Sequence, residues 1–138
     1  MALLTLREKS RYLKELEINS NGELRSDEIT TCEDFADVFI EGVLGKTFDQ
    51  TSQVNIPKII EHIADLVGSA KAWNFLNTGQ SPKKNEYAEG LLKEAKDLLK
   101  MITKKELGIK HKDGTWDEDY PGLQNVEGKE PEDIEIII

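Results

Sequence analysis

The residues with the clearest chemical spacing form the stretch EINSNGELRSDE, residues 17–28. Oxygen-bearing side chains stand at its first, third and fifth positions, which are Glu17, Asn19 and Asn21, and Glu28 stands at the twelfth. A glycine at the sixth position completes the order of a calcium-binding EF-hand loop, in which the last glutamate supplies two oxygens. Calcium binding is therefore the first chemistry to consider.

The charges of this loop argue against a strong calcium site. Only Glu17 and Glu28 would neutralise the ion, and Arg25 places a cation at the ninth position, where a water-mediated ligand is expected. The alternative is an ordinary link between two helices, with Ser26 or Asp27 capping the second one. We favour the link and keep a weak or vestigial calcium site as the alternative.

Other reactive side chains are few. His62 has no second His or Cys four residues away, so it forms no zinc-binding pair, and we expect it to pack or to lie at a rim. His111 lies among lysines and is expected to be solvated, whereas Cys32 falls on an apolar helix face and is expected in the core. With no glycine-rich phosphate loop and no serine elbow in the sequence, we expect a non-enzyme without a cofactor.

The elements that would position these residues read as four helices with short connections. A capping box at Thr5 and Glu8 predicts the first helix, and Gly45 and Pro57 mark the end of the second and the start of the third. Apolar residues repeat at helical spacing in each, and the third is apolar around much of its circumference. The expected ranges are 6–17, 27–44, 57–76 and 84–105.

Composition and charge divide the chain in two. Of the net charge of −9, residues 108–138 carry −6, from three lysines and nine acidic residues. We therefore expect an all-α domain over residues 1–107, a small bundle of about four antiparallel helices, followed by an irregular, acidic and turn-rich C-terminal tail over residues 108–138. An acidic protein of this kind is not expected to grip nucleic acid.

Two features of the sequence bear on where the protein is located. The sequence shows no export signal and no segment long enough to cross a bilayer, so we expect no membrane partner. The single cysteine, Cys32, excludes an internal disulfide framework and fits a reducing compartment.

Two stretches of the tail are candidates for partner binding. Trp116 and Tyr120 lie among acidic residues in GTWDEDYPG, either as anchors for a partner or in a loop that folds back onto its own body. The chain ends in EDIEIII, whose β-branched apolar residues favour burial against a neighbouring subunit or partner. Those residues are Ile134, Ile136, Ile137 and Ile138.

Five segments follow one another along residues 1–109: MALLTLREKSRYL, NSNGELRSDEI, CEDFADVFIEGVLGKTF, IPKIIEHIADLVGSAKAW and SPKKNEYAEGLLKEAKDLLKMITKKELGI. In pattern and helix order they resemble the head–tail connector, or adaptor, proteins of tailed phages, Mu-like members included. Two departures are the absence of a proline between Gly45 and Pro57 and the tail after Ile109, which has no counterpart.

The resemblance implies a ring-forming virion subunit at the head–tail interface, assembled in the host cytoplasm. Its partners would be copies of itself, the portal protein and tail or stopper proteins, with DNA passing through the channel without specific binding. The family offers no catalytic residues to carry over. The alternatives are a non-enzymatic helical protein-binding module, with or without calcium, and a small phage regulator such as an anti-repressor.

Overall fold

The computed structural model describes residues 3–13, 25–48, 56–76 and 82–122, and every structural statement concerns these residues. They form the short helix α1 (Leu6–Lys9) and the long helices α3 (Ser26–Leu44), α4 (Lys58–Leu76) and α5 (Pro82–Thr103). Within these ranges the only β pairing is one isolated antiparallel bridge, between Lys110 and Trp116. The expectation of an all-α body is confirmed, and the three long helices lie within a few residues of their predicted ranges.

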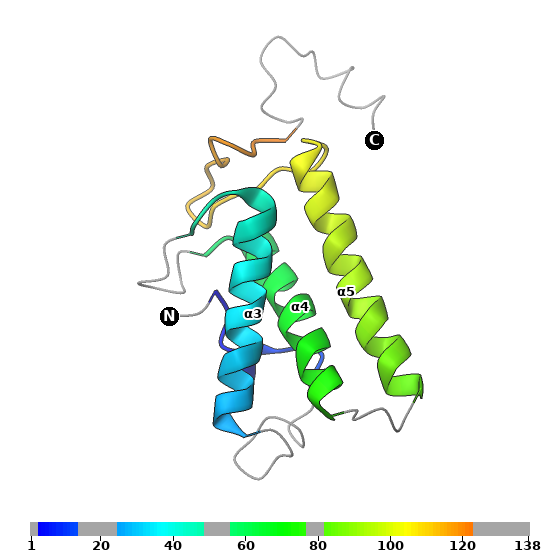
Figure 1. The fold of residues 1–138 in the computed structure, drawn as a ribbon. Helices are drawn as coiled ribbons and strands as arrows, with labels where there is room; N and C mark the ends of the chain where they lie inside the picture. Colours follow the sequence, from blue (N-terminus) through cyan, green and yellow to red (C-terminus); the bar gives the residue numbers. More distant parts are fainter. Residues whose placement is uncertain (1–2, 14–24, 49–55, 77–81, 123–138) are drawn as a thin grey trace.

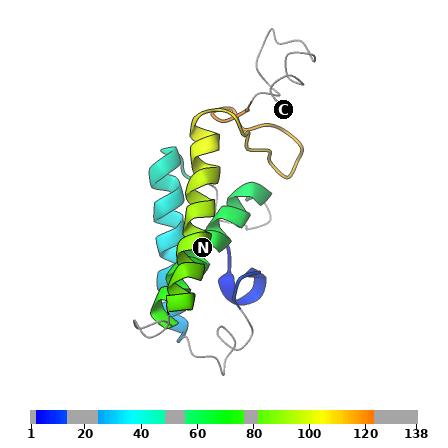
Figure 2. The same ribbon diagram turned by 90° about the vertical axis from the view of Figure 1, so that its right-hand side faces the viewer.

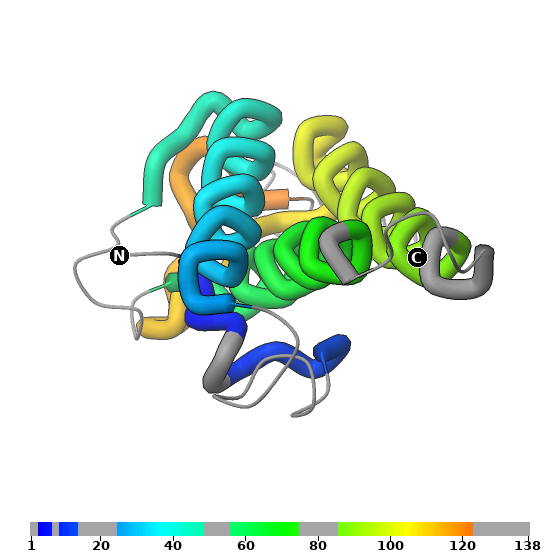
Figure 3. The backbone as a smooth tube through the Cα atoms, turned by 60° about the horizontal axis from the view of Figure 1, so that its bottom comes forward, coloured from blue at the N-terminus to red at the C-terminus, as the bar shows by residue number. Residues whose placement is uncertain are grey.

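The three long helices lie side by side in an up-down-up order, with α4 between α3 and α5 (Figure 1). Figure 3, in which the bottom of the molecule is turned forward, shows the same order. Helix α1 lies to one side of the long helices in Figure 2 and packs against α4 and α3.

Helix α4 is the centre of the core because it is apolar around most of its circumference. Consecutive residues from Ile63 to Ala70 include side chains on every face of the helix, and all of them are buried. At Gly68 an added Cβ would lie only 3.0 Å from the Leu6 side chain, so glycine allows the N-terminal segment to approach α4 closely. The buried apolar residues of this helix are Ile60, Ile63, Ala64, Leu66, Val67, Ala70 and Ala72.

The flanking helices each bury one stripe. In α3 the buried residues Cys32, Ala36, Ile40 and Leu44 repeat at intervals of four, as the sequence predicts. Gly45 then ends the helix with a φ of 64°, a left-handed conformation that glycine adopts without strain. In α5 the buried stripe is Ala88, Leu91, Ala95, Leu99 and Ile102.

The first predicted helix is much shorter than expected. It ends at Lys9 rather than near Glu17, and no side-chain hydrogen bond from Thr5 caps its start. The helix cannot continue because the next backbone N–H groups bind side chains: that of Arg11 donates to Asp65 and that of Leu13 to the Ser10 hydroxyl.

Residues 104–122 cross from the end of α5 to the end of α3 (Figure 1). Ile109 is fully buried in the core, and the Tyr120 hydroxyl donates a hydrogen bond to the Leu44 carbonyl. The described part of the predicted tail therefore shares the core of the helices. Residues 123–138 lie outside the described residues.

Among the described helices, none combines the length and the apolar character that a bilayer-spanning segment needs.

Carboxylates of α3 hold the start of the chain. The backbone N–H of Leu3 donates to Asp37 at 3.1 Å and that of Leu6 donates to Glu33 at 2.8 Å. Burial, with added repulsion from Glu41 and other nearby acids, raises the pKa of Asp37 from its ordinary value of 3.8 to about 6, although the Leu3 hydrogen bond opposes the rise. A raised pKa means that the folded state holds this proton more tightly than the unfolded chain does.

We expect the Asp37→Asn variant to be more stable than the wild type above pH 6. Between about pH 4 and pH 6 the wild type loses stability as Asp37 ionises in the fold, whereas asparagine stays neutral and still accepts the Leu3 N–H. The gain should be about 1 kcal/mol, less than the full shift implies because Asp37 is partly exposed to solvent, and should vanish below about pH 4. Urea unfolding at several pH values measures it, with exposed Asp34→Asn as the control. A gain that is equal at all pH values would contradict this account.

Candidate functional site

A buried carboxylate of α4 fixes the N-terminal segment. Asp65 is 3% exposed and accepts hydrogen bonds from the Ser10 hydroxyl at 2.6 Å and from the Arg11 backbone N–H at 2.8 Å. The hydroxyl of Ser69, one turn further along α4, donates to the same carboxylate at 2.8 Å. The Trp73 indole N–H extends the line of contacts by donating to the Tyr12 carbonyl at 3.0 Å.

A serine beside a carboxylate could indicate nucleophilic chemistry, but the geometry here indicates a structural clamp. The Ser10 hydroxyl donates a hydrogen bond to Asp65 and accepts hydrogen bonds from the backbone N–H groups of Tyr12 and Leu13, each at 3.2 Å. Its lone pairs are thereby engaged, and a nucleophile needs one that is free. Asp65 and Ser10 satisfy backbone groups that a longer first helix would have satisfied internally.

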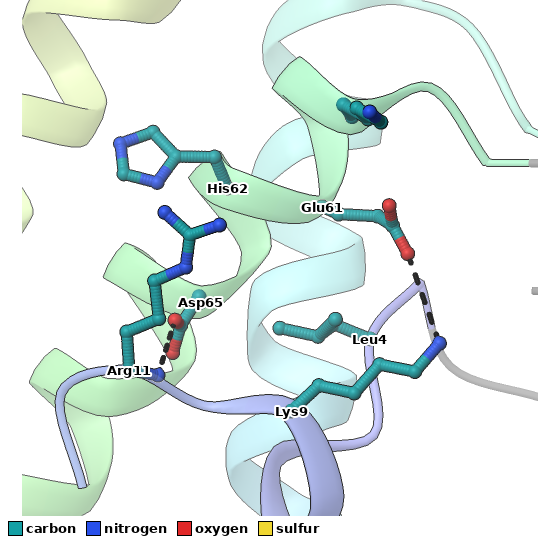
Figure 4. A pocket seen from close by; sticks show the side chains of 7 residues that line it. Leu4, Lys9, Arg11, Glu61, His62 and Asp65 are labelled. Carbon is teal, nitrogen blue, oxygen red and sulfur yellow. Dashed lines mark hydrogen bonds and ion pairs between the residues drawn. The ribbon is translucent and has the colours of Figure 1, made fainter. Parts of the chain in front are cut away.

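Next to this clamp, and lined in part by Asp65 itself, lies a small pocket of about 270 Å³ (Figure 4). Figure 4 shows the Arg11 guanidinium next to the His62 ring, while Lys9 reaches Glu61 at 4.0 Å. Lys58 lines the same pocket. The pocket lining carries three cations, Lys9, Arg11 and Lys58, against the two carboxylates of Glu61 and Asp65, in a chain whose net charge is −9.

A larger groove of about 730 Å³ adjoins the pocket and shares Lys58 with it. Lys112, which lines the groove, forms a 3.0 Å ion pair with Glu61 of the pocket. Trp116 also lines the groove, and the Lys110 ammonium lies 5.7 Å from its ring centroid. We call the pocket and the groove together the basic face.

The loop that builds the groove is organised around Asp117, which is 2% exposed. Its carboxylate accepts hydrogen bonds from Lys46 at 3.0 Å, from His111 at 2.9 Å and from the backbone N–H of Tyr120 at 3.1 Å. Burial alone would raise the pKa of Asp117, but the bonds from Lys46 and His111 outweigh it and hold the pKa below its ordinary value. The expectation of a solvated His111 is therefore wrong, because its ring is half-buried on this carboxylate.

The possible calcium loop is described only at its end. Glu28 accepts the backbone N–H of Arg25 at 3.0 Å and lies 3.5 Å from the Arg25 side chain. It thus caps the start of α3, as a glutamate in the first helical turn commonly does. Glu17, Asn19 and Asn21 lie outside the described residues, so the calcium question stays a prediction.

Two other expectations concern single side chains. Cys32 is fully buried, as expected, and burial raises the pKa of its thiol to about 12, which keeps it protonated. His62 lies at the rim of the pocket, 3.8 Å from Glu94 and 6.3 Å from the Tyr12 ring. Over the four described ranges, no group of three His, Cys, Asp or Glu side chains is placed to hold a metal ion.

The predicted partner-binding residues have different positions. Trp116 lines the groove, whereas Tyr120 packs against the core. For Tyr120 the structure therefore agrees with the alternative of a loop that folds back onto its own body. Ile134, Ile136, Ile137 and Ile138 lie outside the described residues. The clamp at Asp65 was missed, although an acid within the apolar run of α4 was its signal in the sequence.

Comparisons with protein-family models, with curated proteins and with solved structures found no match to this chain. The resemblance to connector proteins therefore stays a prediction.

Replacing Asp65 should weaken the fold strongly. Asp65→Ala leaves the Ser10 and Ser69 hydroxyls and the Arg11 N–H without their acceptor, and we expect a loss of about 3 kcal/mol in the free energy of unfolding. The control is Asp97→Ala on the exposed face of α5, which removes only an ion pair with Lys93 and should cost less than about 0.5 kcal/mol. Urea titration followed by circular dichroism measures both; equal losses would refute the clamp.

Proposed function

We propose that this chain is a non-enzymatic structural protein of a phage virion. It is a head–tail connector or adaptor subunit that forms a ring between the portal and the tail, through which DNA passes. The pattern of residues 1–109 supports this proposal, as does a body built of antiparallel helices. We also propose that a fourth helical element at the N-terminus and the acidic tail are parts of the same building block.

The observation that carries the proposal is an apolar stripe on the outer side of α3. Val38 is 72% exposed, and Phe35 and Val43 are also exposed on this helix. Phe39 lies between them and is partly buried, and nothing lies within 4 Å of the place where a side chain at Gly42 would stand. A continuous apolar strip of this kind is typical of a surface that packs against another copy.

Charge is consistent with a channel for DNA. The body and the tail are both acidic in net charge, and an acidic lining repels phosphate. Duplex DNA then passes without being held, whereas a basic lining would retain it. In this arrangement the basic face lies on the outside of the ring or at a contact between proteins, and not in the channel.

A protein-binding module that does not form rings is the second candidate, and the groove beside Trp116 favours it. It differs from the first proposal by binding a partner as a single copy. Calorimetry with calcium tests whether this module is a calcium sensor. Heat and a change in helix content at millimolar calcium support a sensor, and the absence of both signals excludes it.

The stripe on α3 can be tested by one substitution. Val38→Asp should raise the dissociation constant for self-association at least about tenfold, because assembly would then bury a carboxylate without a partner. Light scattering across a concentration series, alone and with the portal protein of the same phage, measures the mass of the assembly. Met101→Asp, on an α5 residue that is 40% exposed, is the control and should assemble as the wild type does.

Two results would contradict the proposal. One is a wild type that keeps the mass of a single copy at every concentration and in the presence of the portal protein. The other is an assembly that Val38→Asp leaves unchanged.

A further inference from the structure

The groove of the basic face has the features of a peptide-binding site. Its volume is about 730 Å³, and its apolar lining comes from Ile59, Leu107 and the Trp116 ring. Three lysines stand around this lining: Lys58, Lys110 and Lys112. An apolar floor with a cationic rim fits an extended segment that carries both isoleucine-like side chains and carboxylates.

Two of the three lysines have charge available for such a segment. Lys112 is paired with Glu61, but Lys58 and Lys110 have no carboxylate partner within residues 3–13, 25–48, 56–76 and 82–122. The ammonium of Lys110 lies over the Trp116 ring, so it is placed at the edge of the apolar floor.

We propose that this groove is the docking site for the C-terminal segment of the same chain, residues 127–138. That segment, EGKEPEDIEIII, combines five carboxylate side chains with four isoleucines. Its charge is opposite to that of the groove rim, and its β-branched side chains suit an apolar floor.

The chain reaches the end of its described part beside the groove. Pro121 packs so tightly on Gly108 that an added Cβ there would lie 2.5 Å from the Pro121 carbonyl oxygen, and Gly108 lines the groove. Sixteen residues follow Gly122, which span up to roughly 50 Å when extended. A segment tethered at such short range has an effective concentration of roughly millimolar, which favours the same chain over a second copy.

The alternation of the last residues matches the groove chemistry. In an extended segment Ile134, Ile136 and Ile138 share one face, while Asp133 and Glu135 share the other face with Ile137. The isoleucine face covers Ile59, Leu107 and Trp116, and the carboxylates lie at the edge within reach of Lys58 and Lys110. Docking thus removes the isoleucines from water in an isolated chain.

This inference does not depend on ring formation, since it concerns a single copy. Amide hydrogen exchange followed by mass spectrometry on the full chain tests it. We expect the amides of residues 133–138 to exchange at least about tenfold more slowly than those of an unstructured peptide. The protection should be unchanged over a hundredfold dilution.

Substitutions in the tail and in the groove test whether this protection comes from docking in the groove. Ile136→Asp should abolish it, and because residue 136 lies beyond the described core the helices should keep their own protection. Lys58→Glu with Lys110→Glu should also abolish it, and adding Asp133→Lys with Glu135→Lys should restore it by reversing both charges. Lys96→Glu, on the exposed face of α5, is the control and should have no effect.

Each alternative occupant has its own result. Exchange at the unstructured rate in the wild type overturns the proposal. Protection that falls on dilution assigns the groove to a second copy, which also overturns docking within one chain. Unchanged tail exchange in the Lys58→Glu, Lys110→Glu variant, together with loss of binding to a duplex DNA oligonucleotide, assigns the lysines to phosphates and overturns it as well.

Discussion

Burial of α4 on nearly all sides is the constraint on which the rest of this fold depends. A helix with apolar residues around its circumference needs neighbours on every side, and α3 and α5 cover only two of them. The N-terminal segment covers a third, and Asp65 fixes it there by accepting the Ser10 hydroxyl and the Arg11 N–H. The cost of burying this carboxylate is offset by hydrogen bonds that the segment could not make as a continued helix.

The same constraint produces the basic face. Once Ser10 is fixed, Lys9 and Arg11 lie beside the first turns of α4, next to Lys58. The loop after α5, held by the buried Asp117, brings Lys112 and Trp116 to the same side. Cations that are spread along an acidic sequence thus gather on one surface, while the apolar stripe of α3 stays uncovered.

The regular elements could be predicted and their tertiary polar contacts could not. The intervals of four in α3, the proline at residue 57 and the glycine at residue 45 carry local information, so three helices were predicted within a few residues. Asp65, Asp117 and Asp37 acquire their roles from partners 55, 6 and 34 residues away in sequence. The first helix was predicted too long partly for this reason, because the distant Asp65 carboxylate and the local Ser10 hydroxyl compete for its backbone N–H groups.

Our central proposal is that this helical building block meets its own copies through α3. Electron microscopy of the purified chain, alone and with its portal protein, tests this most directly. The account predicts closed rings of uniform size with a central opening wide enough for duplex DNA, in which the α3 stripes lie between subunits. Single small particles under both conditions, or open aggregates without a fixed subunit number, would contradict it.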